Sequence, residues 1–373
     1  MVKLVYIGLF PAVLLGLAVY IQLNASPQQI EVVPSVMNAL RLHRPSPDGT
    51  ALGELQVDVV SVPPLPPGHV LIKVAAAPIN PSDVYRMMGS YGSDEERDAL
   101  VYPTFLGFEG SGTVVATGGG FLPNLLIGSR VAFAARDGGS YAEYFVGKFD
   151  EVVPLPDDVT FEEGASAIVN PLTVIGILDM VERGEHRALI HTAAASSLGK
   201  MLLAMCKERE VPLLNVVRRE SQRDLLLSLG ADPRDVFVST SGAFLSSLRG
   251  RALEVDATIA FDAIAGSSPE TLMQAMPDGG EVFVYGTLSG KAVEEIAPWH
   301  LLTERKILRG FHLKPWLDTQ SILNKVLHFM SVRNLLSSTL RTVYAKEVDL
   351  HGVESAVRHY MSAATGNKVI VKL

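Results

Sequence analysis

Residues 189–220 decide the fold, and they read LIHTAAASSLGKMLLAMCKEREVPLLNVVRRE. An apolar run leads into small residues, then into apolar residues at helical spacing, and then into a second apolar run that ends at Val217. This order predicts a strand, a helix and a second strand. In nucleotide-binding units of this kind, small residues let the backbone approach a pyrophosphate, which is held by free N–H groups at the start of the helix.

The turn between the first predicted strand and the helix carries only part of the glycine pattern of such units. Ala194, Ser196 and Gly199 occupy the three glycine positions of G-x-G-x-x-G, so only the third glycine is present. Small residues at these positions fit a close approach to a pyrophosphate. A plain packing turn explains them about as well, so this turn alone leaves both interpretations open.

The end of the second predicted strand indicates which cofactor would bind. An acidic residue normally stands there and hydrogen-bonds the ribose 2′-hydroxyl of NAD. This chain has Arg218 and Arg219 instead, and a guanidinium offers a fixed fork of donors to phosphate oxygens. The sequence therefore favours the 2′-phosphate of NADPH. The alternative is two solvated arginines at the start of a surface helix.

Composition limits the class of protein. The chain has 373 residues, of which 48% are hydrophobic, which is enough for two domains with cores of their own. A formal net charge of -8 and the lack of a basic stripe argue against a nucleic-acid partner. The single cysteine, Cys206, excludes a disulfide framework and a cysteine-rich zinc site. Its place on an apolar helix face predicts a core residue.

The N-terminal segment is a candidate membrane anchor. Residues 4–23 contain no charged side chain, and roughly twenty apolar residues suffice to cross a bilayer as a helix. We expect residues 1–26 to form a retained transmembrane helix, and the sequence leaves its orientation in the membrane open. A cleaved signal peptide and a buried core helix are the alternatives, although Pro27 makes the preceding residues a poor cleavage site.

The rest of the chain divides into a β-rich part and an alternating part. Short strands broken by Pro and Gly indicate a compact β-barrel-like domain. These strands are expected at 36–43, 55–62, 70–78, 112–116, 130–134 and 141–146. From about residue 160, helices alternate with buried strands, which predicts a doubly wound parallel sheet. Its strands are expected at 188–191, 212–217, 236–239, 257–262, 281–286 and 307–313. A last strand at 368–373 should return to the first domain. We assign residues 27–167 and 318–373 to a catalytic domain and residues 168–317 to a cofactor domain.

Three segments of the first domain resemble the medium-chain dehydrogenase/reductase family. They are Ile79-Asn80-Pro81-Ser82-Asp83, Leu106-Gly107-Phe108-Glu109-Gly110-Ser111-Gly112 and Gly139-Ser140-Tyr141-Ala142-Glu143-Tyr144. The resemblance spans residues 36–373 and implies an α/β fold with a GroES-like β-barrel catalytic domain and a Rossmann cofactor domain. Zinc-dependent members carry a histidine before the glutamate of the Gly-His-Glu segment and use cysteine ligands. Because this chain has Phe108 there and only one cysteine, it is similar to the zinc-free branch, and we expect no metal.

Two groups of relatives compete within that branch, the mitochondrial 2-enoyl thioester reductases and the quinone oxidoreductases. Four segments are similar to the enoyl reductases: Asn170-Pro171-Leu172-Thr173, Ala193-Ala194-Ala195-Ser196, Asn215-Val216-Val217-Arg218, and Leu308-Arg309-Gly310-Phe311-His312-Leu313 with Trp316 close behind. Quinone reductases tend to show Gly-Leu-Thr at the first of these. The four matches in this order favour the enoyl reductases, and that resemblance also implies NADPH.

The resemblance implies where the catalytic groups lie. Reducing an enoyl thioester adds hydride to the β-carbon and pushes negative charge onto the carbonyl oxygen, so a donor must face that oxygen. The family places a tyrosine shortly after the Asn-Pro-Ser-Asp segment in this role, and Tyr91 matches it. An ordinary phenol, with a pKa of about 10, stays protonated at neutral pH. Tyr85 is the rival and is interpreted as a packing residue, and Asn80 is expected to line the same pocket.

The remaining site residues are carried over to the cofactor. Asn170 and Thr173 are expected near the nicotinamide and its ribose, and Ala194, Ser196 and Gly199 near the pyrophosphate. Arg218 and Arg219 are expected at the 2′-phosphate, and Tyr285 and Gly286 at the cofactor edge, where the carboxyl ends of the strands collect ligands. His191 ends the first strand beside the pyrophosphate turn and receives no chemical role.

Three functions remain open from the sequence. The first is a membrane-tethered, NADPH-dependent enoyl reductase, and the second is a quinone or alkenal reductase with the same mechanism. The third is a non-catalytic, reductase-fold subunit of a mitochondrial membrane complex. The expected partners are an enoyl thioester or a quinone, the membrane through the N-terminal helix, and either a second copy or a larger assembly. The mitochondrial inner membrane is the expected location, with the endoplasmic reticulum as second choice.

Overall fold

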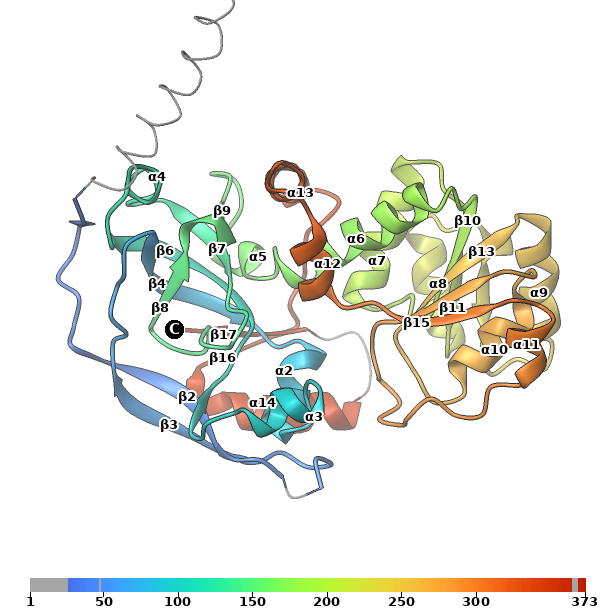
Figure 1. The fold of residues 1–373 in the computed structure, drawn as a ribbon, viewed down its shortest axis with the longest axis horizontal. Coiled ribbons are helices and arrows are strands. Elements are labelled where there is room, and N and C mark those ends of the chain that lie inside the picture. Colours follow the sequence, from blue (N-terminus) through green and yellow to red (C-terminus); the bar gives the residue numbers. More distant parts are fainter. Residues whose placement is uncertain (1–25, 47, 364–367) are drawn as a thin grey trace, which may run out of the picture. The chain divides into compact units, whose positions relative to one another are not determined.

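The computed structural model describes residues 26–46, 48–363 and 368–373. The chain forms two compact units (Figure 1). Unit 1 comprises Met1–Ile168 and Val343–Leu373, and unit 2 comprises Val169–Thr342. Unit 1 is the β-rich part and unit 2 the part in which strands and helices alternate.

Unit 1 is built on an eight-stranded sheet and a three-stranded sheet. The large sheet has the order β16-β17-β4-β6-β7-β9, with β1 paired to β6 and β8 paired to β4, and the small sheet has the order β3-β2-β5. The strands are β1 (Gln28–Gln29), β2 (Val36–Arg44), β3 (Glu54–Ser61), β4 (His69–Pro78), β5 (Thr104–Phe105), β6 (Glu109–Thr117), β7 (Arg130–Ala134), β8 (Tyr144–Lys148), β9 (Val152–Pro154), β16 (Lys346–Val348) and β17 (Val369–Lys372). The β-barrel-like arrangement expected for this part therefore rests on strands from both ends of the chain.

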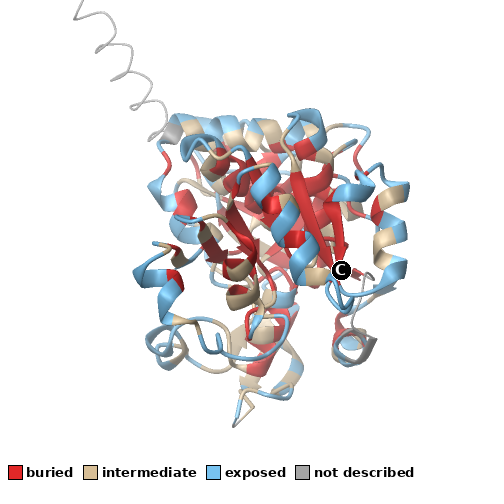
Figure 2. Cartoon of the chain, turned by 90° about the vertical axis from the view of Figure 1, so that its right-hand side faces the viewer, coloured by how far each residue is buried: buried red, intermediate tan, exposed pale blue. Residues whose placement is uncertain are grey.

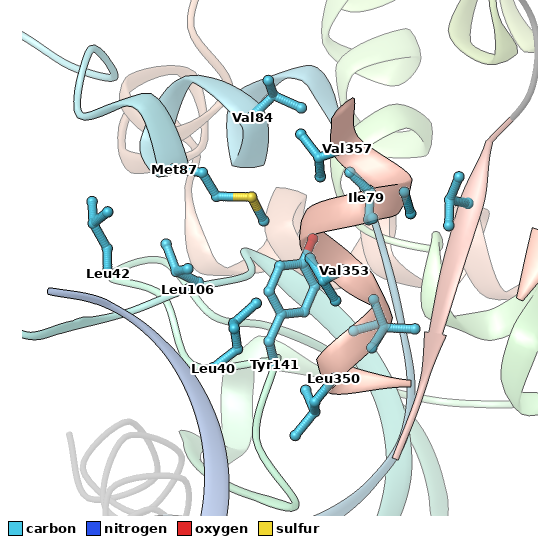
Figure 3. Close-up of a cluster of buried hydrophobic side chains, with 14 of the residues drawn as sticks. Leu40, Leu42, Ile79, Val84, Met87, Leu106, Tyr141, Leu350, Val353 and Val357 are labelled. Atoms are coloured by element: carbon cyan, nitrogen blue, oxygen red, sulfur yellow. The ribbon is translucent and has the colours of Figure 1, made fainter. Parts of the chain in front are cut away.

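The helices of unit 1 are short, except for the last. They are α2 (Pro81–Met88), α3 (Asp94–Asp98), α4 (Phe121–Asn124), α5 (Phe161–Ala165) and α14 (Val353–Ala363), with 3-10 turns at η1 (Phe149–Glu151) and η3 (Leu350–Gly352). Figure 3 shows Met87 of α2 and Val353 of α14 in one apolar cluster around the ring of Tyr141. The Tyr141 hydroxyl donates to the carbonyl oxygen of Pro78 at 2.9 Å. This bond satisfies the one polar atom of that ring, which is 0% exposed.

The C-terminal strand returns to unit 1, as the sequence predicts. β17 pairs antiparallel with β4, with Ile370 opposite Pro78. The N–H of Ile79 donates to the carbonyl oxygen of Val369 at 3.0 Å, which extends the ladder by one step. Residues from the two ends of the sequence therefore lie side by side at the start of α2.

Unit 2 contains a six-stranded parallel sheet of order β12-β11-β10-β13-β14-β15. Its strands are β10 (Ala188–His191), β11 (Leu213–Val217), β12 (Val236–Val238), β13 (Ala257–Asp262), β14 (Glu281–Val284) and β15 (Ile307–Gly310). Its helices are α6 (Val169–Arg183), α7 (Ser197–Glu208), α8 (Glu220–Ser228), α9 (Phe244–Glu254), α10 (Ser268–Ala275), α11 (Pro298–Leu302), α12 (Leu313–Thr319) and α13 (Ile322–Leu335), with a 3-10 turn at η2 (Pro233–Asp235). The order corresponds to 3-2-1-4-5-6 in a doubly wound nucleotide-binding fold.

Alternate residues of these strands face opposite sides of the sheet. Ile190 and Ala260 belong to one apolar cluster together with Leu248 of α9 and Leu272 of α10. Their neighbours in the chain, such as Phe261, face the other side, which explains why the strands are apolar throughout. Figure 2 shows these strands as buried segments between helices whose outer faces are exposed.

The sequence around α7 explains how the helix that follows β10 forms. Ser196 caps it, with its hydroxyl accepting from the N–H of Gly199 at 3.1 Å. Leu202 and Cys206 are buried one turn apart, so the helix presents an apolar face to the unit. Burial of Cys206 confirms its assignment to the core.

Two boundaries differ from those expected. Residues 318–342 belong to unit 2, so the chain returns to unit 1 at Val343 rather than at residue 318. The reason is that α12 and α13 pack against α6, inside unit 2. The strand expected at 307–313 ends at Gly310, because His312 caps α12 and Leu313 begins that helix.

The predicted fold class needs one correction. The α/β fold with its β-rich and doubly wound parts is present, but we also predicted a transmembrane helix. Within the residues that the structure describes, no helix is both long and apolar enough to cross a bilayer. The predicted segment, residues 4–23, lies outside the described residues.

Candidate functional site

The turn after β10 has the backbone shape of a phosphate-binding turn without its first two glycines. Ala193 adopts a left-handed conformation with φ 51°, which is uncommon for a residue with a side chain. The N–H of Ala194 donates to the carbonyl oxygen of Val216 at 3.2 Å, so it ties the turn to β11. Ser196 then begins α7 as its cap. The turn is fixed at both ends, and the remaining free N–H groups of the first helical turn suit a pyrophosphate.

Gly199 is the glycine that this turn requires. A Cβ atom built on it would lie 2.2 Å from the carbonyl oxygen of Ala194, which is backbone and cannot rotate away. The close approach of α7 to the turn therefore depends on a residue without a side chain. This contact is the helix–strand packing for which the third glycine of the motif is used.

Arg218 and Arg219 follow β11, and both are exposed. Their backbone N–H groups donate to Oε1 of Gln222 at 3.0 and 3.1 Å, which fixes the turn into α8. The guanidinium of Arg218 forms no hydrogen bond or ion pair with another residue in the described ranges. A fixed backbone with an available cation suits a 2′-phosphate, and the assignment of Arg218 to that group stays a prediction.

A buried carboxylate at the end of β13 stabilises the edge of the sheet, and sequence analysis did not identify it. Asp262 is 0% exposed and accepts from the hydroxyls of Thr192 and Ser268 at 2.7 and 2.6 Å and from the N–H of Ala265 at 2.7 Å. Thr192 Oγ1 also accepts from the N–H of Ala263 at 2.8 Å. These bonds connect the turns after β10 and β13. The signal in the sequence was an aspartate at the end of an apolar strand.

Tyr285 and Gly286 lie directly after β14, at the same edge. The Tyr285 hydroxyl lies 2.7 Å from Nε2 of His191, and the two rings are stacked with centroids 5.8 Å apart. A Cβ atom on Gly286 would lie 2.8 Å from the carbonyl oxygen of Ala263, so the close packing of the backbone here also requires a residue without a side chain. His191, which received no role from the sequence, is thus the hydrogen-bond partner of a predicted cofactor residue.

Asn170 and Thr173 lie in the first turns of α6. Thr173 is buried and Asn170 is half-buried. Further along α6, a Cβ atom on Gly176 would lie 2.8 Å from the ring of Phe311 and 3.2 Å from that of Trp316. The helix therefore packs closely against the aromatic side chains of the motif that follows β15.

These residues fit a bound NADPH on the evidence of unit 2 alone. Backbone packing at Gly199 and the capped start of α7 suit its pyrophosphate, and the available guanidinium of Arg218 suits its 2′-phosphate. Tyr285 and Gly286 directly follow β14, the strand next to β13, at the carboxyl edge. The segments that carry Gly199, Arg218 and Tyr285 follow three strands of one parallel sheet, whose carboxyl ends share the edge where such folds bind dinucleotides. Their roles toward NADPH stay predictions.

The predicted catalytic residues are in unit 1. Asn80 caps α2 and is 2% exposed. Its Nδ2 donates to Oε1 of Glu109 at 2.8 Å, and its backbone N–H donates to Oδ2 of Asp83 at 2.7 Å. The N–H of Ile168 donates to the second oxygen of Glu109 at 3.0 Å. Oδ1 of Asn80 has no hydrogen-bond partner within the described part of the chain, so it is an available acceptor.

Tyr91 follows the other end of α2. Its ring centroid lies 5.0 Å from that of Phe108, and the guanidinium carbon of Arg86 lies 5.9 Å from the same Phe108 ring. Burial raises the pKa of the Tyr91 phenol to about 12, with the Asp83 carboxyl group as the next cause. The rival Tyr85 packs against the apolar cluster around Tyr141.

Phe108 and Glu109, which are neighbours in the chain, connect the two predicted catalytic residues. Phe108 contacts the ring of Tyr91, and Glu109 accepts from Asn80. Sequence analysis treated Phe108 only as the residue that replaces a zinc ligand. No group of three or more His, Cys, Asp or Glu side chains among the described residues could hold a metal ion.

Two further buried charges near Asn80 were also missed. The pKa of Asp83 is raised to about 7, mainly by burial and in smaller part by the nearby Glu109 carboxylate. Lys368, immediately before β17, is 6% exposed, and burial lowers its pKa. Lys368 interacts electrostatically with the carboxyl groups of Glu109 and Asp83, so these three side chains form a polar interior near the start of α2.

Comparison with known proteins identifies a dehydrogenase domain and several reductases as relatives. Residues 66–157 match the alcohol dehydrogenase GroES-like domain family. The mitochondrial enoyl-[acyl-carrier-protein] reductase of Caenorhabditis elegans is 30% identical over 288 residues, which are 74% of this chain and 79% of that protein. The enzyme of the same name from Arabidopsis thaliana is 28% identical over 272 residues, 70% of this chain and 69% of that protein.

The solved structures give a similar result. A Mesorhizobium loti protein assigned as an NADPH:quinone reductase is 31% identical, with a TM-score of 0.81, and the match covers 92% of this chain and 100% of that chain. A Bacillus thuringiensis protein with the same assignment is 25% identical, with a TM-score of 0.78, over 91% of this chain and 99% of that chain. Both curated relatives and both solved structures are named as reductases.

Proposed function

The chain belongs to the zinc-free branch of the medium-chain dehydrogenase/reductase family, and on that premise we propose that it reduces the activated carbon–carbon double bond of a 2-enoyl thioester. It is an oxidoreductase, and its cofactor is NADPH. Because the relatives are named as enzymes, the non-catalytic alternative is not carried further. The acyl substrate and the roles of individual residues are the content of the proposal.

The observation that carries the proposal is the environment of Tyr91. Enoyl reduction requires a donor that faces the carbonyl oxygen as negative charge develops on it. Burial holds the Tyr91 phenol in its protonated form, with a pKa of about 12, and contact with Phe108 fixes its ring. A half-buried, protonated and oriented hydroxyl suits this task, and a high pKa keeps it a hydrogen-bond donor across the physiological range.

The other residues of unit 1 would prepare the substrate side. Oδ1 of Asn80 is a buried acceptor held in place by the bond from its Nδ2 to Glu109. This oxygen would accept a hydrogen bond from a donor group of the substrate or the cofactor. In unit 2, the start of α7 and Arg218 would hold NADPH, which supplies the hydride. Phe108 and Tyr91 would exclude water from the developing charge by their apolar surfaces.

The experiment is a comparison of acceptors for NADPH oxidation by the purified full chain. We expect short 2-enoyl-coenzyme A thioesters to be reduced with a kcat/KM at least tenfold above that for simple quinones. The saturated acyl-coenzyme A of the same length should give no oxidation, because it lacks the double bond. Activity with quinones and none with any enoyl thioester would overturn the proposal.

The second candidate is a quinone reductase of the same branch. It is favoured by the Mesorhizobium loti protein assigned as an NADPH:quinone reductase, which matches 92% of this chain at 31% identity. The segment Asn170-Pro171-Leu172-Thr173 supports the enoyl substrate instead, because quinone reductases tend to show Gly-Leu-Thr there. Because the two candidates differ in the acceptor that they reduce, the comparison of acceptors above separates them.

A mitochondrial location forms part of the same proposal. The enoyl reductases of Caenorhabditis elegans and Arabidopsis thaliana are both named as mitochondrial. Fractionation of cells that express the full chain would test it. Recovery of the chain in the mitochondrial fraction is expected, and its recovery elsewhere would contradict this part.

A further inference from the structure

The side chains of His191 and Tyr285 form a hydrogen-bonded pair inside unit 2. His191 ends β10, and Tyr285 comes directly after β14, so β13 lies between their strands. Nε2 of His191 and the hydroxyl oxygen of Tyr285 are 2.7 Å apart. The rings are nearly parallel, at 15°, with centroids 5.8 Å apart. The pair therefore spans the middle strand at the carboxyl edge of the sheet.

The register of the sheet fixes this geometry. His191 is opposite Phe261 on β13, and Phe261 is opposite Phe283 on β14. Tyr285 lies two residues after Phe283, which places it on the same face. The rings of Phe261 and Phe283 are stacked with centroids 5.5 Å apart. This aromatic pair lies on the same face of the sheet, next to His191 and Tyr285.

Burial decides the protonation of both groups. His191 is 0% exposed, and burial lowers its pKa to about 3, so the imidazole is neutral at physiological pH. Burial raises the pKa of Tyr285 well above its ordinary value, so the phenol keeps its proton. A neutral imidazole has one N–H donor and one acceptor nitrogen. One hydrogen bond to Tyr285 therefore uses only one of the two ring nitrogens.

The unused nitrogen indicates the direction of the hydrogen bond. Nδ1 of His191 is buried and has no hydrogen-bond partner in the described part of the chain. A buried N–H without a partner is rarer than an unused acceptor. The tautomer with its proton on Nε2 avoids an unpaired N–H, and in it Nε2 donates to the Tyr285 oxygen. The Tyr285 hydroxyl then keeps its own proton for another acceptor.

We propose that His191 is a positioning residue for NADPH: it donates to Tyr285 and so turns the Tyr285 hydroxyl into a donor to an oxygen atom of the bound cofactor. This inference rests on the placement of Tyr285 at the cofactor edge in the proposed function. The ligand chemistry is a hydrogen-bond acceptor such as the carboxamide oxygen or a ribose oxygen of the nicotinamide half. His191 itself acts through Tyr285 and needs no contact with the cofactor.

The test is a double-mutant cycle on NADPH affinity in the full chain, with no second substrate present. Tyr285→Phe and His191→Phe keep an aromatic ring and remove the hydrogen bond. Each should weaken NADPH binding by about three- to tenfold, the range for one neutral hydrogen bond. The double variant should bind no more weakly than Tyr285→Phe alone, because the two residues act as a unit. Losses that simply multiply, or a Tyr285→Phe variant with unchanged affinity, would overturn the inference.

Two further variants distinguish positioning from general damage to the fold. His191→Gln carries an amide N–H at the reach of Nε2 and should restore most of the affinity, whereas His191→Asn is too short and should not. Equal affinities for these two variants would contradict the inference. Tyr344→Phe is the matched control, because it removes a buried hydroxyl that is bonded to Ser166 in unit 1, and it should leave NADPH affinity unchanged. Since the assay contains only NADPH, failure of enoyl reduction would not alter its result.

Discussion

Arg218 and Arg219 are the residues that the sequence assigned most specifically, since they stand where an acidic residue would serve a free ribose. The structure fixes their backbone through Gln222 and leaves both side chains exposed. Thr240 Oγ1 also donates to the carbonyl oxygen of Arg218 at 3.2 Å. A fixed backbone lowers the entropic cost of ordering these side chains when a phosphate binds.

Replacing both arginines with alanine should weaken NADPH binding by more than tenfold and leave NADH binding nearly unchanged. A hydrogen bond to a charged group contributes about 1.5–3 kcal/mol, and NADH lacks the phosphate that would be recognised. Titration of each cofactor into the two proteins measures this. Arg234→Ala is the control, because Arg234 is paired with Asp232 at 2.8 Å and has no assigned role. Equal losses for both cofactors would contradict the assignment.

The buried imidazole of His191 should make the fold sensitive to acid. Its pKa is about 3 in the folded chain, against 6.5 for an ordinary histidine. Between these values the unfolded chain binds the additional proton, so stability is lost as the pH falls below 6.5. Relative to His191→Gln, the parent should lose about 1 kcal/mol of unfolding free energy between pH 7 and pH 5.5. Urea unfolding at both pH values measures the difference, and parallel pH dependences would show that His191 is not buried as described.

Single residues also show where sequence analysis stops. The sequence identified Phe108 as a missing ligand, but its contact with Tyr91 joins two segments of the chain that no local pattern connects. The bond between Asn80 and Glu109 spans 29 residues, and that between His191 and Tyr285 spans 94. Such pairs depend on sheet register and on helix placement. The residue types could be predicted, but their partners could not.

At the scale of elements, the turn and helix that follow β10 carry the cofactor site. Gly199 permits α7 to approach the carbonyl oxygen of Ala194, and Ser196 caps the same helix. The left-handed conformation of Ala193 shows that the turn keeps its shape without a glycine there. The element therefore depends on one glycine rather than three.

Gly199→Ala should lower the unfolding free energy by about 1–3 kcal/mol, because the new methyl group meets backbone and forces α7 away from the turn. NADPH affinity should fall with it. Gly250→Ala is the matched control, since Gly250 is in α9 and a Cβ atom there meets nothing within 4 Å. That variant should gain up to about 1 kcal/mol through helix propensity. Thermal unfolding with and without NADPH measures both, and a fully stable Gly199→Ala would refute the packing argument.

Elements were predictable where apolar runs are bounded by polar residues or by Gly and Pro. The bounds of β7, β10 and β13 agree with the predicted ranges. The end of β15 was less clear, because the apolar residues after Gly310 belong to α12, and helix and strand share such short runs. The packing of α12 and α13 against α6 could not be seen in the sequence, so the return to unit 1 was placed too early.

At the scale of the whole molecule, the two units divide the predicted chemistry. Unit 2 carries the residues assigned to NADPH, and unit 1 carries Tyr91 and Asn80. The parallel sheet and the β-rich unit could be predicted from alternating patterns and from the resemblance to a known family, whereas the order of the strands came from the structure. Whether the chain reduces an enoyl thioester depends on the substrate side, so the central claim rests on the hydroxyl of Tyr91.

The most direct test is the single-turnover rate of NADPH oxidation by a short 2-enoyl-coenzyme A in the parent, Tyr91→Phe and Tyr85→Phe. We predict that Tyr91→Phe slows this step by about 10²- to 10³-fold, as expected for loss of one donor to a developing oxyanion, with NADPH affinity unchanged. Tyr85→Phe should be close to the parent, because Tyr85 packs against the core. A parent that reduces the substrate while Tyr91→Phe is equally fast would contradict the role of Tyr91, and a parent that binds NADPH but reduces no enoyl thioester would contradict the proposed function.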